Sequence, residues 1–289
     1  MVGFFAKFAG FVRAAARREH PCRVVLAEAL VRTRLCRALT IRRPLYRLRF
    51  FPTNLSKSLW ADPLDRLSDE VLLAAYLRPG DVYVDVGANV GTHTLAAARC
   101  VGPNGRVYSF EPHPSIYKCL VANIALNKAQ WVRAFNVACA DLDGVLGFTD
   151  VGADDENEVA LSGPQIMVPA RCLDSALPPD EGTVAMLKID AEGFELRVLA
   201  GAKRVLNSTD CVFYESCDAH FARYGYTSRD VIAFLDGSGF GVYSYSAKSR
   251  EVAPIARDYI SRDLANLLAI RDLPLFLDRT GYTLFEGPS

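Results

Sequence analysis

The sequence has no uninterrupted apolar segment long enough to cross a lipid bilayer. It also lacks a Cys-x-x-Cys pair and any alternating cluster of cysteine and histidine, so its eight cysteines predict neither a zinc site nor a disulfide framework. Hydrophobic residues make up 51% and charged residues 23% of the chain, which excludes a disordered or collagen-like protein. We therefore expect a globular protein with reduced cysteines, in the cytoplasm.

Serine is absent from the first fifty residues, and acids are scarce there. Residues 1–50 carry twelve Lys or Arg against two acids, whereas the rest of the chain carries 21 bases and 31 acids. The missing serine argues against a transit peptide, and apolar residues ahead of the basic cluster argue against a secretory signal. Apolar stripes at residues 4–15 and 24–39 predict helices. We expect a basic helical extension over 1–50 and the main domain over 51–289.

Three roles are open for this extension. It can pack on the main domain, or it can pack on a partner subunit and so form a homodimer. A basic amphipathic helix can also lie on an anionic membrane surface, which would bring residues 1–40 into peripheral membrane contact. No nucleic-acid recognition motif accompanies the basic residues, so no nucleic-acid partner is expected.

From residue 72 onward, strand-like and helix-like segments alternate, which predicts an α/β domain around a doubly wound, mostly parallel sheet. The sequence predicts seven strands, at residues 82–86, 106–110, 131–138, 184–189, 211–214, 241–245 and 264–270. The last of them is expected to run antiparallel. Residues 141–164 are rich in Asp, Gly and Asn and predict a loop with a hairpin.

The first strand ends in the most informative turn of the chain, which reads Asp85-Val86-Gly87-Ala88-Asn89-Val90-Gly91. Gly87 permits a close approach that a side chain would block. Gly91 stands where the next helix begins, so unpaired N–H groups there can face a ligand. The spacing is GxxxG and not GxGxxG, and Asp85 would repel a pyrophosphate but attract an ammonium group. These features favour S-adenosylmethionine over NAD as the cofactor.

Two further acids follow the next two strands. Glu111 lies twenty residues after Gly91, where a carboxylate can accept hydrogen bonds from both hydroxyls of a ribose. Asp141 is placed to reach an adenine amino group, although it can equally serve as a turn residue in Ala-Asp-Leu-Asp-Gly. We therefore expect Glu111, and less directly Asp141, in the cofactor site.

A second polar block reads Leu187-Lys188-Ile189-Asp190-Ala191-Glu192-Gly193-Phe194-Glu195. Ligands of open α/β sheets bind outside the carboxyl ends of the strands, so Asp190 and Glu192 should face the crevice. Glu195 can instead stabilise the first turn of the next helix. A buried lysine needs a partner, so Lys188 is expected to pair with one of these acids. Glu215 adds a carboxylate from the neighbouring strand.

These motifs together resemble the FkbM family of methyltransferases. The resemblance covers about residues 65–245 and rests on DVGANVG, FEPHP, the helix end Asn123-Ile124-Ala125-Leu126-Asn127, Leu173-Asp174, and KIDAEGFE followed by Leu199-Ala200-Gly201-Ala202. It implies a class I methyltransferase sheet of the Rossmann-like type and S-adenosylmethionine as methyl donor. It also implies O-methylation of hydroxyl groups on glycans, sugar-containing molecules or polyketide-type molecules.

The resemblance also implies roles for individual residues. The methionine end of the donor is assigned to Asp85, Gly87, Asn89 and Gly91, and the ribose to Glu111. Methyl transfer from a sulfonium mainly requires that the acceptor be positioned and its hydroxyl proton be removed.

Asp190 and Glu192 are the candidates for the base or for holding the acceptor. His220, five residues after Glu215, is the alternative base, unless it is only a surface residue. We expect no metal, although Asp190, Glu192 and Glu215 are oxygen ligands of the kind that magnesium prefers.

Two other functions would use a similar sheet. A nicotinamide-dependent oxidoreductase would retain the ribose acid, but the missing GxGxxG and the presence of Asp85 argue against it. A non-catalytic nucleotide-binding scaffold would retain the fold and lose the acids at the strand ends, and here those acids are present.

Overall fold

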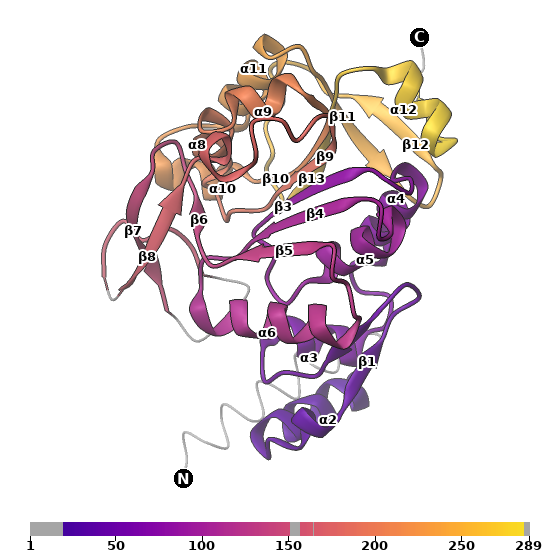
Figure 1. Cartoon of the computed structure of the whole chain (residues 1–289), viewed down its shortest axis with the longest axis vertical. Coiled ribbons are helices and arrows are strands. Elements are labelled where there is room, and N and C mark those ends of the chain that lie inside the picture. The colour runs from indigo at the N-terminus through magenta and orange to yellow at the C-terminus, as the bar shows by residue number, and fades with distance from the viewer. Residues whose placement is uncertain (1–19, 151–156, 164, 286–289) are drawn as a thin grey trace.

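The computed structural model describes residues 20–150, 157–163 and 165–285. A large sheet crosses the middle of the molecule, with helices on both of its faces (Figure 1). In spatial order its described strands are β14 (Thr283–Leu284), β12 (Glu251–Pro254), β11 (Gly241–Ser246), β13 (Ala265–Ile270), β10 (Thr209–Ser216), β9 (Val184–Ile189), β3 (Val82–Val86), β4 (Arg106–Phe110) and β5 (Val132–Phe135). The five neighbouring strands β10, β9, β3, β4 and β5 pair in parallel. Strand β13 is antiparallel to both β10 and β11. The predicted doubly wound sheet and its antiparallel strand are confirmed.

The sheet is two strands wider than the seven that the sequence predicts. All seven are present, and β12 and β14 extend the edge beyond β11 in the described part of the chain. Strand β12 folds back antiparallel on β11, and β14 then pairs in parallel with β12. With four and two residues, neither added strand is long enough to show an alternating apolar pattern.

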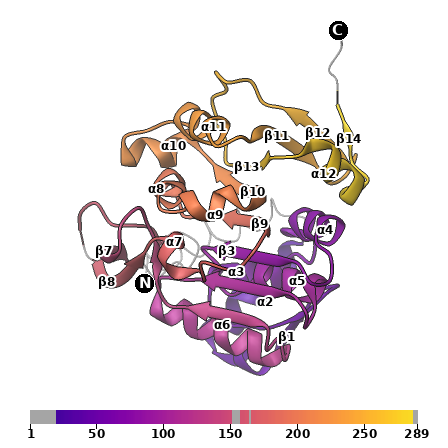
Figure 2. The same ribbon diagram turned by 45° about the horizontal axis from the view of Figure 1, so that its top comes forward.

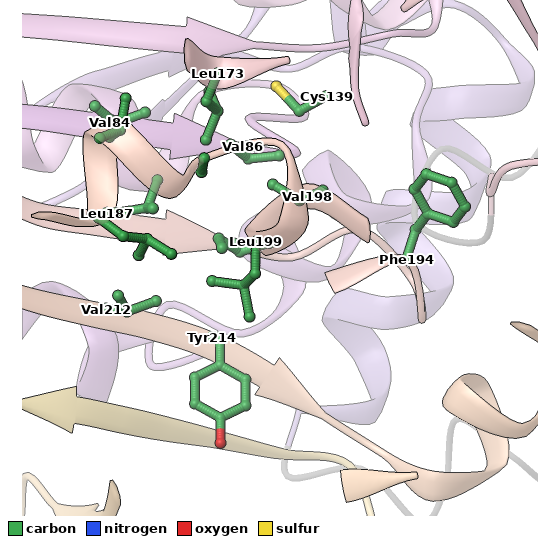
Figure 3. Close-up of a cluster of buried hydrophobic side chains, with 14 of the residues drawn as sticks. Val84, Val86, Cys139, Leu173, Leu187, Phe194, Val198, Leu199, Val212 and Tyr214 are labelled. Atoms are coloured by element: carbon green, nitrogen blue, oxygen red, sulfur yellow. The ribbon is translucent and has the colours of Figure 1, made fainter. Parts of the chain in front are cut away.

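The central strands are buried on both faces because their side chains alternate between two cores. Val82, Val84 and Val86 of β3 face one core and Tyr83 faces the other. Figure 3 shows part of the first core, where Val84 and Leu187 lie near helix side chains. The helices that close the first core are α8 (Glu195–Ala200), α9 (Lys203–Asn207) and α11 (Ser228–Gly237). Those of the second core are α4 (Leu67–Tyr76), α5 (Thr92–Val101), α6 (Pro114–Leu126) and α12 (Leu273–Thr280).

A three-stranded sheet lies beside the main sheet (Figure 2). It consists of β6 (Ala138–Cys139), β8 (Gln165–Arg171) and β7 (Gly144–Thr149), and α7 (Leu173–Ala176) follows it. The pair of β7 and β8 is antiparallel, as expected for a hairpin in this region. The strand predicted at 131–138 is divided into β5 and β6, because the chain leaves the main sheet and pairs with β8.

The described part of the N-terminal extension packs against the main domain. It contains α2 (Pro21–Arg32), the 3₁₀ helix η1 (Leu35–Ala38), β1 (Thr40–Arg42) and β2 (Arg47–Arg49), and α3 (Asn54–Ala61) follows at the start of the main domain. The backbone N–H groups of Arg47 and Arg49 donate to Asn127 and Asn123 at the end of α6, at 2.9 and 2.8 Å. The hairpin of β1 and β2 is absent from the helical prediction because each strand has only three residues.

The stripe predicted at residues 4–15 lies outside the described residues, whereas the stripe at 24–39 forms α2 and η1. The division of the chain at residue 50, the homodimer and the membrane contact stay predictions. In the part of the chain that the structure describes, no helix is long and apolar enough to cross a membrane.

Candidate active site

A cavity opens at the carboxyl ends of β3, β4 and β9, where the sequence places its polar motifs. Among the predicted site residues, Gly87, Asn89, Glu111, Asp190 and Glu192 line it. The lining is completed by Leu55, Arg66, Val86, Ala88, Thr92, His93, Phe110, Pro112, Val137, Ala138, Cys139, Phe148, Asn157, Val159, Lys188, Ala191 and Phe194. The cavity therefore has a polar side at the strand ends and an apolar side formed largely by β6 and its neighbours.

The turn after β3 is built for close approach to the turn after β9. Gly87 has φ +74°, and a Cβ there would lie 1.8 Å from the carbonyl oxygen of Asp190. The N–H of Asp190 donates to the carbonyl of Val86 at 3.1 Å, which joins the two turns directly. The close approach predicted for Gly87 is thus made to protein backbone.

At the end of the same turn, where α5 begins, an N–H group that the sequence predicts to be unpaired is already hydrogen-bonded. Gly91 has φ +97° and precedes the first residue of the helix. Its N–H donates to the carbonyl of Ala88 at 2.9 Å, so this group is already paired within the turn. Asn89 also has a positive φ of 50°, in the left-handed region that Asn tolerates better than most residues.

Glu111 follows β4 and is held by backbone groups. Its two carboxylate oxygens accept from the N–H groups of Asn89 and His113, each at 2.9 Å. Each oxygen has a second lone pair, so the carboxylate can accept two further hydrogen bonds. Burial raises the pKa of Glu111 to about 7. The two backbone N–H groups therefore fix the position of the carboxylate, and its remaining lone pairs can accept hydrogen bonds from a ligand in the cavity.

Lys188 connects the two polar motifs. Its ammonium donates to the carbonyls of Val86 and Gly87 at 3.1 and 2.8 Å. It lies 3.3 Å from an oxygen of Asp85 and 3.4 Å from an oxygen of Asp190. Burial alone would lower the pKa of Lys188, but Asp190 and Asp85 hold it above the usual value. The expected pairing of this lysine with an acid of its own motif is present, and Asp85 is a second partner.

Asp85 itself lies behind the cavity wall. Its side chain is fully buried and accepts from the hydroxyl of Thr94 as well as facing Lys188. Asp141 is also outside the cavity lining, where it forms an ion pair with Arg197 at 3.0 Å. The predicted contacts of Asp85 with the ammonium group of S-adenosylmethionine, and of Asp141 with its adenine, stay predictions.

Three of the polar residues predicted near the strand ends meet beside the cavity, and of these Glu192 is in its lining. Nδ1 of His220, in α10 (Asp218–Phe221), lies 3.5 Å from Oε2 of Glu192 and 3.6 Å from Oε2 of Glu215. Burial and the nearby charges of Asp190 and Glu215 raise the pKa of Glu192 to about 9. His220 thus lies beside Glu192, and its role as the alternative base stays a prediction.

Glu195 does not join this cluster. Its Oε1 accepts from the N–H groups of Ala191 and Gly193, at 2.8 and 3.3 Å. Burial raises its pKa to about 8. This carboxylate stabilises the turn that carries Asp190 and Glu192, which precedes the first turn of the helix where its role was expected.

The sequence does not predict two polar residues that act on Asp190, Arg66 and His93, nor Asp69, the partner of His93. Arg66 lines the cavity from the segment before α4 and has φ +56°. His93, near the start of α5, lies 3.4 Å from Asp69 of α4, which also accepts from the hydroxyl of Tyr245. The position of His93, two residues after Gly91, could have marked it as a site residue. No spacing in the sequence links Arg66 or Asp69 to the strand ends, so these two residues could not be predicted.

Comparison with known proteins points in one direction. A family model described as a methyltransferase FkbM domain matches residues 85–242. A protein-L-isoaspartate O-methyltransferase of Methanothrix thermoacetophila is 34% identical over 95 residues, which cover 33% of this chain and 43% of that protein. This chain therefore spans less than half the length of that relative.

Two relatives match over longer segments. A hexuronic acid methyltransferase of Haloferax volcanii is 27% identical, over 50% of this chain and 59% of its own length. A 31-O-demethyl-FK506 methyltransferase of Streptomyces tacrolimicus is 29% identical, over 57% of this chain and 75% of its own length. A solved structure titled methyltransferase FkbM, from Methylobacillus flagellatus, is 14% identical and covers 74% of this chain and 54% of its own, with a TM-score of 0.40.

The close contact between the turns after β3 and β9 can be tested by substituting Gly87, with Gly80 as the control glycine. Gly80 has φ +94° and nothing within 4 Å of an added Cβ, so Gly80→Ala should cost only the left-handed strain of about 1–2 kcal/mol. Gly87→Ala should lower the free energy of unfolding by clearly more, because the methyl group would overlap the backbone of Asp190. Urea denaturation of both variants measures the difference. Equal losses would contradict the tight contact.

Proposed function

The chain belongs to the FkbM methyltransferase family, and from that premise we propose that it transfers a methyl group from S-adenosylmethionine to a hydroxyl group of a glycan, another sugar-containing molecule or a polyketide-type molecule. Family membership argues against the nicotinamide-dependent oxidoreductase that a similar sheet would also support. The acids retained at the strand ends argue against a non-catalytic scaffold.

The donor half of the cavity suits a nucleoside. Glu111 supplies a buried carboxylate with acceptor capacity toward the cavity, which fits the two hydroxyls of a ribose. Ala138, Cys139 and Phe110 supply apolar surface for an adenine ring. The turn at Gly87 and Asn89 lies between these groups and Asp190, where the methionine end would be held.

The acceptor half carries the proposal of a hydroxyl substrate. Asp190, Glu192, Glu215 and His220 gather at or just beyond the carboxyl ends of β9 and β10. A hydroxyl group can donate a hydrogen bond to a carboxylate of such a cluster and accept one from a protonated member. This cluster of polar groups is the observation that supports a hydroxyl substrate.

S-adenosylmethionine supplies a methyl group on a sulfonium: the O–CH₃ bond forms as the S–CH₃ bond breaks, and the sulfur leaves as a neutral thioether. The chain has to hold the hydroxyl in line, which can contribute roughly 7–11 kcal/mol, and to accept its proton, which contributes about 10²–10⁴-fold in rate. Asp190, Glu192 and His220 are our candidates for holding the hydroxyl and for taking the proton.

The donor site is tested by calorimetric titration with S-adenosylhomocysteine, with NADH as the control ligand. Wild type should bind the former and not the latter. Glu111→Ala should weaken binding by about tenfold or more, because each lost hydrogen bond to a charged group is worth about 1.5–3 kcal/mol. Glu251→Ala, on β12 at the far edge of the sheet, is the matched control and should bind normally. Binding that Glu111→Ala leaves unchanged would contradict the assignment.

Donor affinity should also depend on pH through Glu111. Its pKa of about 7 means that the carboxylate is ionised above neutrality and protonated below it. Only the ionised form keeps all four acceptor positions, so affinity should rise by about tenfold from about pH 6 to about pH 8. Titrations of wild type and Glu111→Gln across this range measure the effect. The variant, which cannot ionise, should show a flat profile; the same slope in both proteins would rule Glu111 out.

The acceptor chemistry is tested with methyl-labelled S-adenosylmethionine and a panel of sugars, uronic acids and polyketide-type alcohols. Label should enter a neutral hydroxyl compound as a methyl ether, which mild alkali does not cleave. Label that mild alkali releases would identify a methyl ester, and the acceptor would then be a carboxyl group. An enzyme preparation boiled before use is the control for non-enzymatic transfer.

A further inference from the structure

Three potential metal ligands converge at the acceptor end of the cavity from different elements. Glu192 lies in the turn after β9, Glu215 in β10 and His220 in α10. Each offers one ligand atom, and these atoms all lie within 4.8 Å of one another. No other group of this kind is found among the described residues. The convergence brings two carboxylates and one imidazole to a single point.

The spacing within this cluster is wider than hydrogen bonding requires. The two contacts of His220 Nδ1, at 3.5 and 3.6 Å, exceed the usual range of about 2.7–3.2 Å. Two ligands that each lie about 2.1 Å from one cation are separated by roughly 3–4 Å. The two distances from His220 Nδ1 to the carboxylates therefore match those between ligands of a shared ion.

One member of the cluster lacks the hydrogen bond that burial demands. Nδ1 of His220 is buried and has no hydrogen-bond partner. Glu215 beside it is only 8% exposed, and its carboxylate lies 3.6 Å from that nitrogen. Buried polar groups are rarely left this way, and an ion is one of the recognised explanations.

The protein holds the cluster together at a cost in backbone strain. Glu192 has φ +53°, and the adjacent Gly193 has φ +101°. A Cβ on Gly193 would lie 2.7 Å from the carbonyl oxygen of His220, so this glycine lets the β9 turn approach α10. Lys188, the nearest buried cation of the β9 strand, is already engaged by Asp85 and Asp190. Arg223 and Arg66 act electrostatically on Glu192 and Glu215, but among the described residues neither glutamate forms an ion pair with a lysine or arginine.

We propose that Glu192, Glu215 and His220 bind a divalent cation of the Mn²⁺ or Mg²⁺ type, which holds the acceptor through its hydroxyl oxygens. Carboxylate oxygens suit these ions, and imidazole is tolerated by Mn²⁺. Three protein ligands leave three positions of an octahedral ion for the acceptor and water. An acceptor with two neighbouring oxygens would bind best. The inference rests on the proposed methyltransferase function, in which the cation would lower the pKa of the hydroxyl. Asp190, held by Lys188, would then be the remaining base.

The test is a titration of the full chain with Mn²⁺, in which electron paramagnetic resonance measures the free ion. Wild type should bind one saturable Mn²⁺. Glu215→Gln and His220→Ala should each weaken that binding by about tenfold or more, since even outer-shell partners are worth about 10–100-fold. Glu251→Gln, an acid remote from the cavity, is the matched control and should bind Mn²⁺ as wild type does.

Binding of S-adenosylhomocysteine to each variant shows that it is folded and separates the two proposals. Wild type that binds S-adenosylhomocysteine without saturable Mn²⁺ binding would overturn the cation site alone. Mn²⁺ binding that neither variant weakens would place the ion elsewhere and also overturn it. Failure to bind S-adenosylhomocysteine would count against the methyltransferase function instead.

Discussion

The site depends on one buried ammonium group. Lys188 lies in the middle of the sheet, where an uncompensated charge would be very costly, and it is balanced by Asp85 on β3 and Asp190 after β9. Removing one member of such a buried pair typically costs about 3–5 kcal/mol. Because the same ammonium also donates to the backbone of Val86 and Gly87, it fixes the distance between the two turns that border the cavity.

The distance between the two turns also sets how far apart the proposed donor and acceptor would be held in the cavity. The turn after β3 and Glu111 border the donor half, and the turn after β9 carries Asp190 and Glu192 into the acceptor half. A methyl group must pass in line between two bound molecules, so an error in their separation of about 1 Å can cost about 10²-fold in rate. Lys188 and the backbone contact at Gly87 hold the two turns at this separation, and both residues also line the cavity.

The features that the sequence predicts well are encoded by neighbouring residues, such as an apolar run or a single charged residue within a strand. Apolar runs locate the seven strands, and a lysine inside one of them already implies an acidic partner, as found for Lys188. What it misses depends on contacts between distant segments. Arg66 reaches the cavity from before α4, and Asp141 lies against Arg197, a contact that no spacing in the chain encodes. Strands β12 and β14 are missed because they are too short to show a pattern.

The segment before the first strand of the sheet also contributes to the cavity. Leu55 of α3 and Arg66 both line it, although the family match begins only at residue 85. The donor-side residues, from Gly87 to Glu111, lie within the matched region, whereas these two lie outside it. The acceptor-side residues Asp190 and Glu192 also lie within the matched region, so the segment before β3 adds to a cavity whose two halves the matched region already borders. Hydrogen bonds from Arg47 and Arg49 to the end of α6 fix this segment against the rest of the chain.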